Sequence, residues 1–182
     1  LAEATAYFTA SRRQIADNIF LTTQMMALFL GLMISGAGWF LLPAVLARNP
    51  LVVQQSARAY LLLFAIPCLG SISGCAWLQG AGHVRSFNIG RATAHVTTAA
   101  VMATLTLLGL ASVESYLGAM LVGNFLAWAV VLKAWFAQRN PLSRVTLGLV
   151  PQILSYGSRV QIGSWSASAN VQLDQLMLSS LA

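Results

Sequence analysis

Residues of the types that carry out chemistry are few in this sequence, and their spacing favours no catalytic centre. His83 and His95 have no cysteine or carboxylate partner at the spacing of metal ligands. Cys68 and Cys75 lie within one apolar run, where cysteine is usually a small packing residue. The sequence contains no phosphate-binding glycine loop and no nucleophile motif. We therefore expect no catalytic residue, no metal, no cofactor and no enzymatic activity.

The informative polar residues are those inside long apolar runs. Asp174 is the one carboxylate within such a run. A charge in the middle of a bilayer costs at least about 2.5 kcal/mol, so Asp174 should face other helices or water. Asn170 lies one helical turn before it on the same face. Arg159 falls on roughly that face, but about 22 Å away along a helix, too far to pair directly.

A second polar stripe lies on the other side of the same predicted helix. Its members are Gln161, Ser164, Ser168, Gln172 and Gln175. Two polar faces indicate either hydrogen bonds between helices or one packed face and one face toward a wet cavity. Asn124 is a candidate for the same cavity. The third run adds a row of threonines, for which bonding to carbonyls of their own helix is the stronger interpretation. These are Thr93, Thr97 and Thr104.

These polar residues belong to a chain that is too apolar for a water-soluble domain. Hydrophobic residues make up 58% of the sequence and charged residues 8%, against about 25% charged residues in soluble domains. Each long run is close to the roughly 20 residues that cross a bilayer as a helix. The runs cover residues 21–46, 59–78, 92–111, 116–136 and 161–181. The sequence thus predicts an all-α, polytopic integral membrane protein with about five transmembrane helices.

The distribution of basic residues predicts the orientation of these helices. The side that holds residues 1–20, 80–91 and 137–159 carries eight of the ten lysines and arginines, and the other side carries two. Loops rich in lysine and arginine stay in the cytoplasm, so these three segments are predicted to be cytoplasmic. The basic residues are scattered between apolar runs rather than clustered on one face, which argues against a nucleic-acid partner.

Small residues at helix-packing spacing occur within the runs. Gly70 and Gly74 form a GxxxG motif, and Gly31 and Ser35 form a weaker equivalent. Such positions let helix backbones approach closely, and packing within the bundle is favoured here over a dimerisation face. Pro67 removes a backbone hydrogen bond in the middle of the second run and should kink that helix; the kink is either a common structural feature or a gate hinge.

The chain resembles a known transporter family in the order and spacing of three stretches. They read EATAYFTASRRQ before the first run, LQGAGHVRSFNIGRAT between the second and third runs, and SYGSRVQIGSWSASANVQLDQLMLSSLA at the end. In this respect the chain is similar to the polysaccharide and O-antigen (Wzx-type) flippases of the MOP superfamily, which also contains the MATE multidrug exporters and the lipid II flippases. The similarity extends over nearly the whole chain.

The resemblance implies a MATE-like, two-lobe bundle around a central cavity that opens alternately to either face. Residues 1–137 would hold helices of the first lobe, residues 138–156 a cytoplasmic linker, and residues 157–182 the start of the second lobe, so the chain reads as an internal piece of a longer protein. The implied substrate is an oligosaccharide on a polyprenyl pyrophosphate, carried to the outer leaflet of a bacterial inner membrane for lipopolysaccharide or other surface polysaccharide. Membrane lipids and other polysaccharide-assembly membrane proteins are the further implied partners.

One feature common in the family, a basic residue inside the cavity, is missing from the predicted runs, which contain no mid-membrane lysine or arginine. Two alternatives therefore stay open. A MATE-type cation-coupled multidrug exporter would carry an ionisable coupling residue in the first lobe, and runs one to four have none. A non-transport membrane component of surface-polymer assembly would need chemistry at the membrane face.

Overall fold

The structure is a computed structural model that describes residues 1–48, 50–139 and 141–163. Every regular element in this part of the chain is helical, which confirms the predicted all-α, membrane-type fold. The long helices are α1 (Ala2–Ser11), α2 (Ala16–Val45), α3 (Leu51–Gly80), α4 (Val84–Leu107) and α5 (Val113–Phe136). Short 3-10 turns follow α1 (Arg13–Ile15) and precede the last described helix (Leu147–Leu149), which covers residues 150–163.

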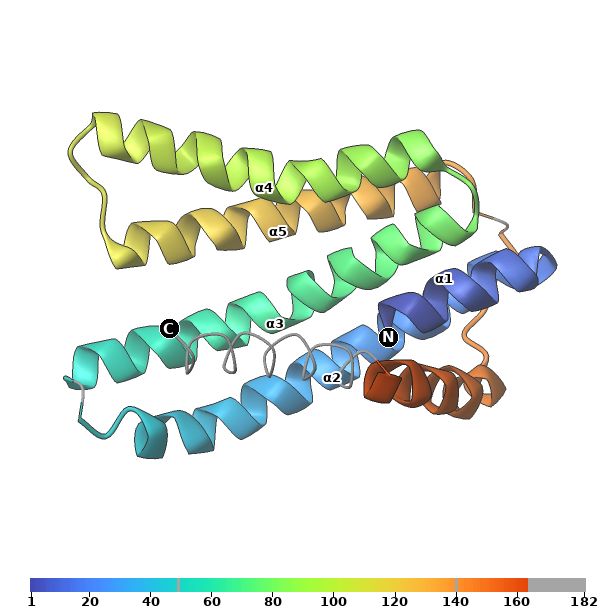
Figure 1. Cartoon of the computed structure of the whole chain (residues 1–182), viewed down its shortest axis with the longest axis horizontal. Helices are drawn as coiled ribbons and strands as arrows, with labels where there is room; N and C mark the ends of the chain where they lie inside the picture. The colour runs from blue at the N-terminus through green and yellow to red at the C-terminus, as the bar shows by residue number, and fades with distance from the viewer. Residues whose placement is uncertain (49, 140, 164–182) are drawn as a thin grey trace, which may run out of the picture.

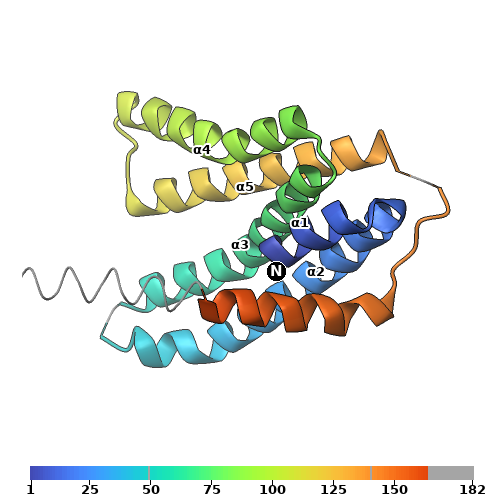
Figure 2. The same ribbon diagram turned by 45° about the vertical axis from the view of Figure 1, so that its right-hand side comes forward.

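Helices α2 to α5 run alternately up and down, joined by tight turns (Figures 1 and 2). Glycine makes two of these turns possible. Gly82 and Gly109 take left-handed backbone angles, with φ of 82° and 69°, directly after α3 and α4. The next amides, of His83 and Leu110, donate back to carbonyls five residues earlier, at 2.9 and 2.8 Å. This is the Schellman arrangement, which satisfies free carbonyls at a helix end and reverses the chain.

Three of the described helical segments are long and apolar enough to cross a membrane: Arg13–Val45, Val53–Gly80 and Val113–Phe136. Helix α4 has a crossing length but a more polar first half, with Arg85, Arg91 and His95. The fifth expected run, 161–181, lies almost entirely outside the described residues. About five spans were expected, and the described part of the chain contains three candidate spans.

The two ends of the bundle differ in charge as the sequence predicts. The ends of α3 and α5 and the starts of α2 and α4 lie together at one end in both views, and the ends of α2 and α4 and the starts of α3 and α5 lie at the other (Figures 1 and 2). The first end holds seven of the eight basic residues assigned to the cytoplasm, all but Arg159. They are Arg12, Arg13, Arg85, Arg91, Lys133, Arg139 and Arg144.

This arrangement predicts the sides from which two introduced cysteines react. Ser115 lies in the first turn of α5 and Ser143 in the loop after α5. Ser143→Cys should react with a membrane-impermeant maleimide only from the cytoplasm, and Ser115→Cys only from outside, because one helix separates them. The unsubstituted protein, with Cys68 and Cys75, gives the background. Labelling of both introduced cysteines from the same side would contradict the predicted orientation.

The small residues of the sequence pack helices against one another within the bundle. An added Cβ at Gly70 would lie 2.6 Å from Nε1 of Trp128, and one at Gly74 would collide with Val131. Both neighbours belong to α5, so the GxxxG motif of α3 packs against that helix. Gly31 of α2 packs on α3 in the same way. Close packing at small residues is one source of helix association in lipid, where hydrophobicity cannot drive it.

A hydrogen-bonded side chain ties the same three helices together. Gln24 of α2 donates to the carbonyl of Gly70 and to the hydroxyl of Ser73 on α3, both at 3.1 Å. Its oxygen accepts from Nε1 of Trp128 on α5 at 2.9 Å. Polar groups in an apolar bundle need such partners, and this amide fixes the register of α2, α3 and α5. Helix α3 itself continues through the buried Pro67 without interruption.

The segment expected as a linker is more structured than predicted. The last described helix starts at residue 150, before the expected start of the second lobe at 157 and of the fifth run at 161. Pro151 lies in its first turn, where proline is tolerated. Leu149 and Ile153 are buried against α1 and α2. The second half of this segment therefore belongs to the bundle. The sequence contains a signal for this helix, since Leu149, Ile153, Tyr156 and Val160 recur at helical spacing.

Candidate functional site

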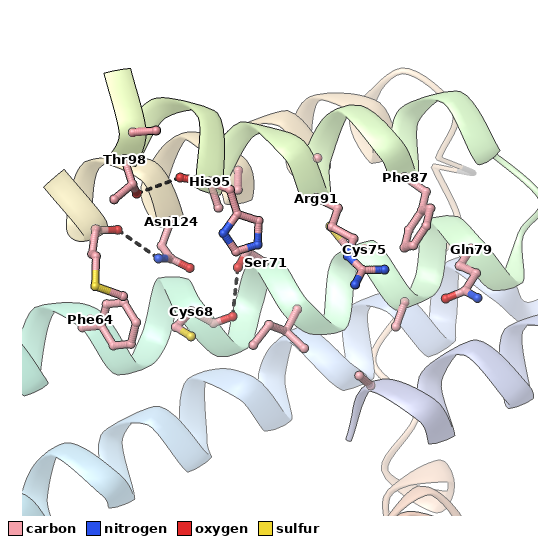
Figure 3. Close-up of a pocket in the computed structure, with 18 of the residues that line it drawn as sticks. Phe64, Cys68, Ser71, Cys75, Gln79, Phe87, Arg91, His95, Thr98 and Asn124 are labelled. Atoms are coloured by element: carbon pink, nitrogen blue, oxygen red, sulfur yellow. Dashed lines mark hydrogen bonds between the residues drawn. The ribbon is translucent and has the colours of Figure 1, made fainter. Parts of the chain in front are cut away.

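A groove with a cavity volume of about 720 Å³ runs along the bundle between α3, α4 and α5 (Figure 3). Ligand pockets commonly have about 300–1,000 Å³, so it is large enough for part of an amphipathic molecule. Every fourth or third residue of each helix faces it, which is the periodicity of one helix face. Phe64, Cys68, Ser71, Ile72, Cys75, Ala76 and Gln79 line it from α3, and Tyr116, Met120, Asn124 and Ala127 from α5.

Helix α4 supplies the charged side of the groove. Arg91 and His95 are one turn apart on the same face, and Thr98 and Met102 continue it. Arg91 lies seven residues after the start of α4, so it is about 10 Å along the helix from the N-terminal end of α4. Figure 3 shows Arg91 between Cys75 and Gln79, with His95 next to Ser71. The groove therefore carries a cation toward the end of the bundle where α4 begins.

Among the described residues that line the groove, none is an aspartate or glutamate. The Arg91 charge is thus not neutralised by an acid within the groove. A positive charge in a cleft with apolar walls raises the local concentration of anions, because the low-dielectric walls focus its field. The electrostatics of the groove suit an anionic ligand better than a cationic one.

Several polar groups in the groove already have backbone partners. The Thr98 hydroxyl donates to the carbonyl of Ala94 at 2.8 Å, and the Asn124 amide donates to the carbonyl of Met120 at 2.9 Å. The Ser71 hydroxyl donates to the carbonyl of Cys68 at 2.9 Å. These bonds satisfy the donors inside an apolar environment. The carbonyl oxygen of the Asn124 side chain remains the acceptor that this residue brings to the groove.

The apolar wall is continuous from the middle of the groove toward the opposite end. Phe64 of α3, Met102 of α4 and Met120 of α5 form it. Methionine is flexible and polarizable, and it packs against chains of irregular shape. The polarity of the groove therefore changes along its length, from Arg91 and Gln79 near the start of α4 to an apolar wall farther along.

The structure brings one of the residues predicted for the site into the groove. Asn124 lines it, whereas Arg159 and Gln161 are exposed on the last described helix and do not. Asp174 and Asn170 lie outside the described residues. The threonine row of α4 (Thr93, Thr97 and Thr104) does not line the groove. Thr93 and Thr104 donate to carbonyls of their own helix, which was the favoured interpretation of this row.

Sequence reasoning missed Arg91 and His95 as site residues. It began the third run at residue 92, so Arg91 was assigned to a loop, but α4 begins at Val84 and carries Arg91 on its second turn. A signal was present: residues 87, 91, 95, 98 and 102 follow the spacing of one helix face. That spacing also places a basic residue, Arg91, on the side of α4 that lines the groove, just before the predicted third run.

In the described part of the chain, no group of three or more histidines, cysteines, aspartates and glutamates could hold a metal ion.

In comparisons with known proteins, no family model, curated protein or solved structure matches the chain. The geometry of the groove is therefore the main guide to function.

Proposed function

We propose that this chain is part of a transporter that moves a polyprenyl-pyrophosphate-linked oligosaccharide from the inner to the outer leaflet of a bacterial plasma membrane. It does so by alternating access, as a step in surface polysaccharide synthesis. The observation that carries the proposal is the position of Arg91, a cation inside a long groove that otherwise has largely apolar walls.

The chemistry of this substrate matches the gradation of the groove. A pyrophosphate is an anion that arginine binds through two parallel hydrogen bonds. Gln79 and His95, on either side of Arg91, add further polar contacts for phosphate or sugar. The polyprenyl chain is apolar and fits beside Phe64, Met102 and Met120 or in the surrounding lipid. A cationic drug, in contrast, would be repelled by Arg91, which disfavours a MATE-type multidrug exporter.

A photo-crosslinking experiment tests this assignment. A polyprenyl pyrophosphate with a diazirine near its head group should label peptides from 64–79 of α3 and 87–102 of α4. Arg91→Gln should lower the labelling about tenfold, since a hydrogen bond to a charged group contributes about 1.5–3 kcal/mol. Arg85→Gln is the matched control, because both arginines are exposed on α4 but only Arg91 lines the groove. Equal labelling of both variants would remove Arg91 from the proposal.

A further inference from the structure

Arg91 shares its face of α4 with His95, which lies one helical turn farther along. Residues four apart on a helix are neighbours, with Cβ atoms about 5–6 Å apart. Both side chains are exposed and line the groove. In Figure 3 they enter it from α4 and point toward α3, with Arg91 beside Cys75 and His95 beside Ser71. A ligand between α3 and α4 can therefore contact both side chains at once.

The groove contains polar side chains of two kinds. Ser71, Thr98 and Asn124 donate to backbone carbonyls. Arg91 and His95, in contrast, have no hydrogen-bond or ion-pair partner in the part of the chain that the structure describes. The N–H groups of these two side chains are thus available to a ligand, and the two residues are neighbours on α4.

His95 can add a second positive charge to this part of the groove. Histidine is the side chain that ordinarily changes its charge between pH 5 and 8. The charged and titratable groups that line the groove with it are Arg91 on α4, Cys68 and Cys75 on α3, and Tyr116 on α5, and none of the described lining residues is a carboxylate. Thiols and phenols are largely neutral below about pH 8. The partner that stabilises a proton on His95 is therefore an anionic ligand rather than a neighbouring acid.

We propose that Arg91 and protonated His95 each bind one phosphate of the pyrophosphate, so that His95 selects a pyrophosphate-linked lipid over a monophosphate-linked one. The inference rests on the proposed substrate class and adds a specificity determinant to it. The planar guanidinium binds one phosphate through two hydrogen bonds. The imidazolium donates a charge-assisted hydrogen bond to the other phosphate. A monophosphate held by Arg91 has no second phosphate to offer to His95.

The charge of His95 fixes the direction in which this selection depends on pH. The second phosphate attracts a proton to the imidazole, since an opposite charge favours the ionised form. The preference for pyrophosphate is therefore present at low pH, where His95 carries its proton, and is lost as the pH rises and the proton leaves. Arg91 stays charged throughout, so binding itself persists at high pH.

An equilibrium binding measurement on the full-length protein in detergent micelles tests the assignment. The probes are a polyprenyl pyrophosphate and a polyprenyl monophosphate that carry the same sugar. Phosphates linked on both sides lack the second ionisation near pH 6 of a terminal phosphate, so a pH dependence reports on the protein. The preference of the unsubstituted protein for the pyrophosphate should be about tenfold larger at pH 6 than at pH 8.5, because a hydrogen bond to a charged group is lost.

Three variants assign this pH dependence to one residue. His95→Gln keeps a hydrogen-bond donor without the charge, so its preference at pH 6 should fall to the level that the unsubstituted protein shows at pH 8.5. His95→Arg keeps a charge at both pH values and should keep the preference at both. His83→Gln is the matched control, because His83 precedes α4 with its ring 6.1 Å from that of Trp77 and does not line the groove. It should behave as the unsubstituted protein.

The outcomes separate failure of this inference from failure of the proposed transport. A pH-dependent preference that survives His95→Gln, or that is lost equally in His83→Gln, would overturn the role of His95. If such a protein still translocates the lipid, the proposed transport stands without this inference. A preference that depends on His95 in a protein that does not translocate the lipid would support the pair of cations and reject the transport. Binding of neither lipid would overturn both.

Discussion

Replacement of Gly123 by leucine is expected to destabilise the bundle more than a change at any other glycine of α5. A Cβ at this position would lie 2.5 Å from the carbonyl oxygen of Ala94 and 2.7 Å from the Thr98 hydroxyl, both on α4. The backbone of α4 has no room to yield without loss of its packing on α5. Thr98 also donates to the carbonyl of Ala119 on α5 at 3.4 Å, a bond that separation of the helices breaks. We expect a loss of about 3 kcal/mol in the free energy of unfolding.

Gly118 provides the control for this prediction. It lies on the same helix, and a Cβ there would meet nothing within 4 Å. Gly118→Leu should therefore leave the unfolding midpoint in mixed micelles near that of the unsubstituted protein, while Gly123→Leu should lower it strongly. Similar midpoints for the two variants would show that α4 and α5 do not pack as described.

A bulky residue on the groove wall of α4 is expected to stop transport without unfolding the protein. Ala99 lines the groove and is exposed there, so tryptophan at this position fills the space beside Met102 and Thr98. The large side chain has room to enter the groove rather than the packed core, and the fold should persist. Transport by Ala99→Trp should fall to background, with abundance and unfolding midpoint unchanged.

The neighbouring residue gives a matched comparison. Ala100 is also exposed on α4 but does not line the groove. A tryptophan there points about 100° away around the helix. Ala100→Trp should transport normally. If both variants transported at the rate of the unsubstituted protein, the groove would not be the substrate path.

The helices and their order could be predicted from the sequence because long apolar runs and basic loops are strong signals. The apolar runs mark α2, α3 and α5, and the basic residues of their loops divide between the two ends of the bundle as expected. The packing role of Gly70 and Gly74 was also readable, since close helix contacts need small residues at this spacing.

The groove was harder to predict because its residues come from three helices. Asn124 was identified as a polar residue inside an apolar run, but Arg91 was not, because hydropathy placed the start of its helix too late. A charged residue near a helix end is easily assigned to a loop. For Arg91, the helix face that it shares with His95 and Met102 indicates otherwise. The contact of Tyr7 with Tyr156 joins the start of the chain to its far end, and no local pattern indicates such a contact.

The central claim is that the groove carries a lipid-linked anion across the membrane with help from Arg91, and a translocation assay tests it most directly. The full-length protein is reconstituted in vesicles that contain a fluorescent oligosaccharide on polyprenyl pyrophosphate in one leaflet, and a membrane-impermeant quencher reports its transfer. We predict that the protein accelerates transfer, that Arg91→Gln slows it about tenfold, and that Arg85→Gln does not. Transfer no faster than in protein-free vesicles, or equal rates for the two variants, would contradict the claim.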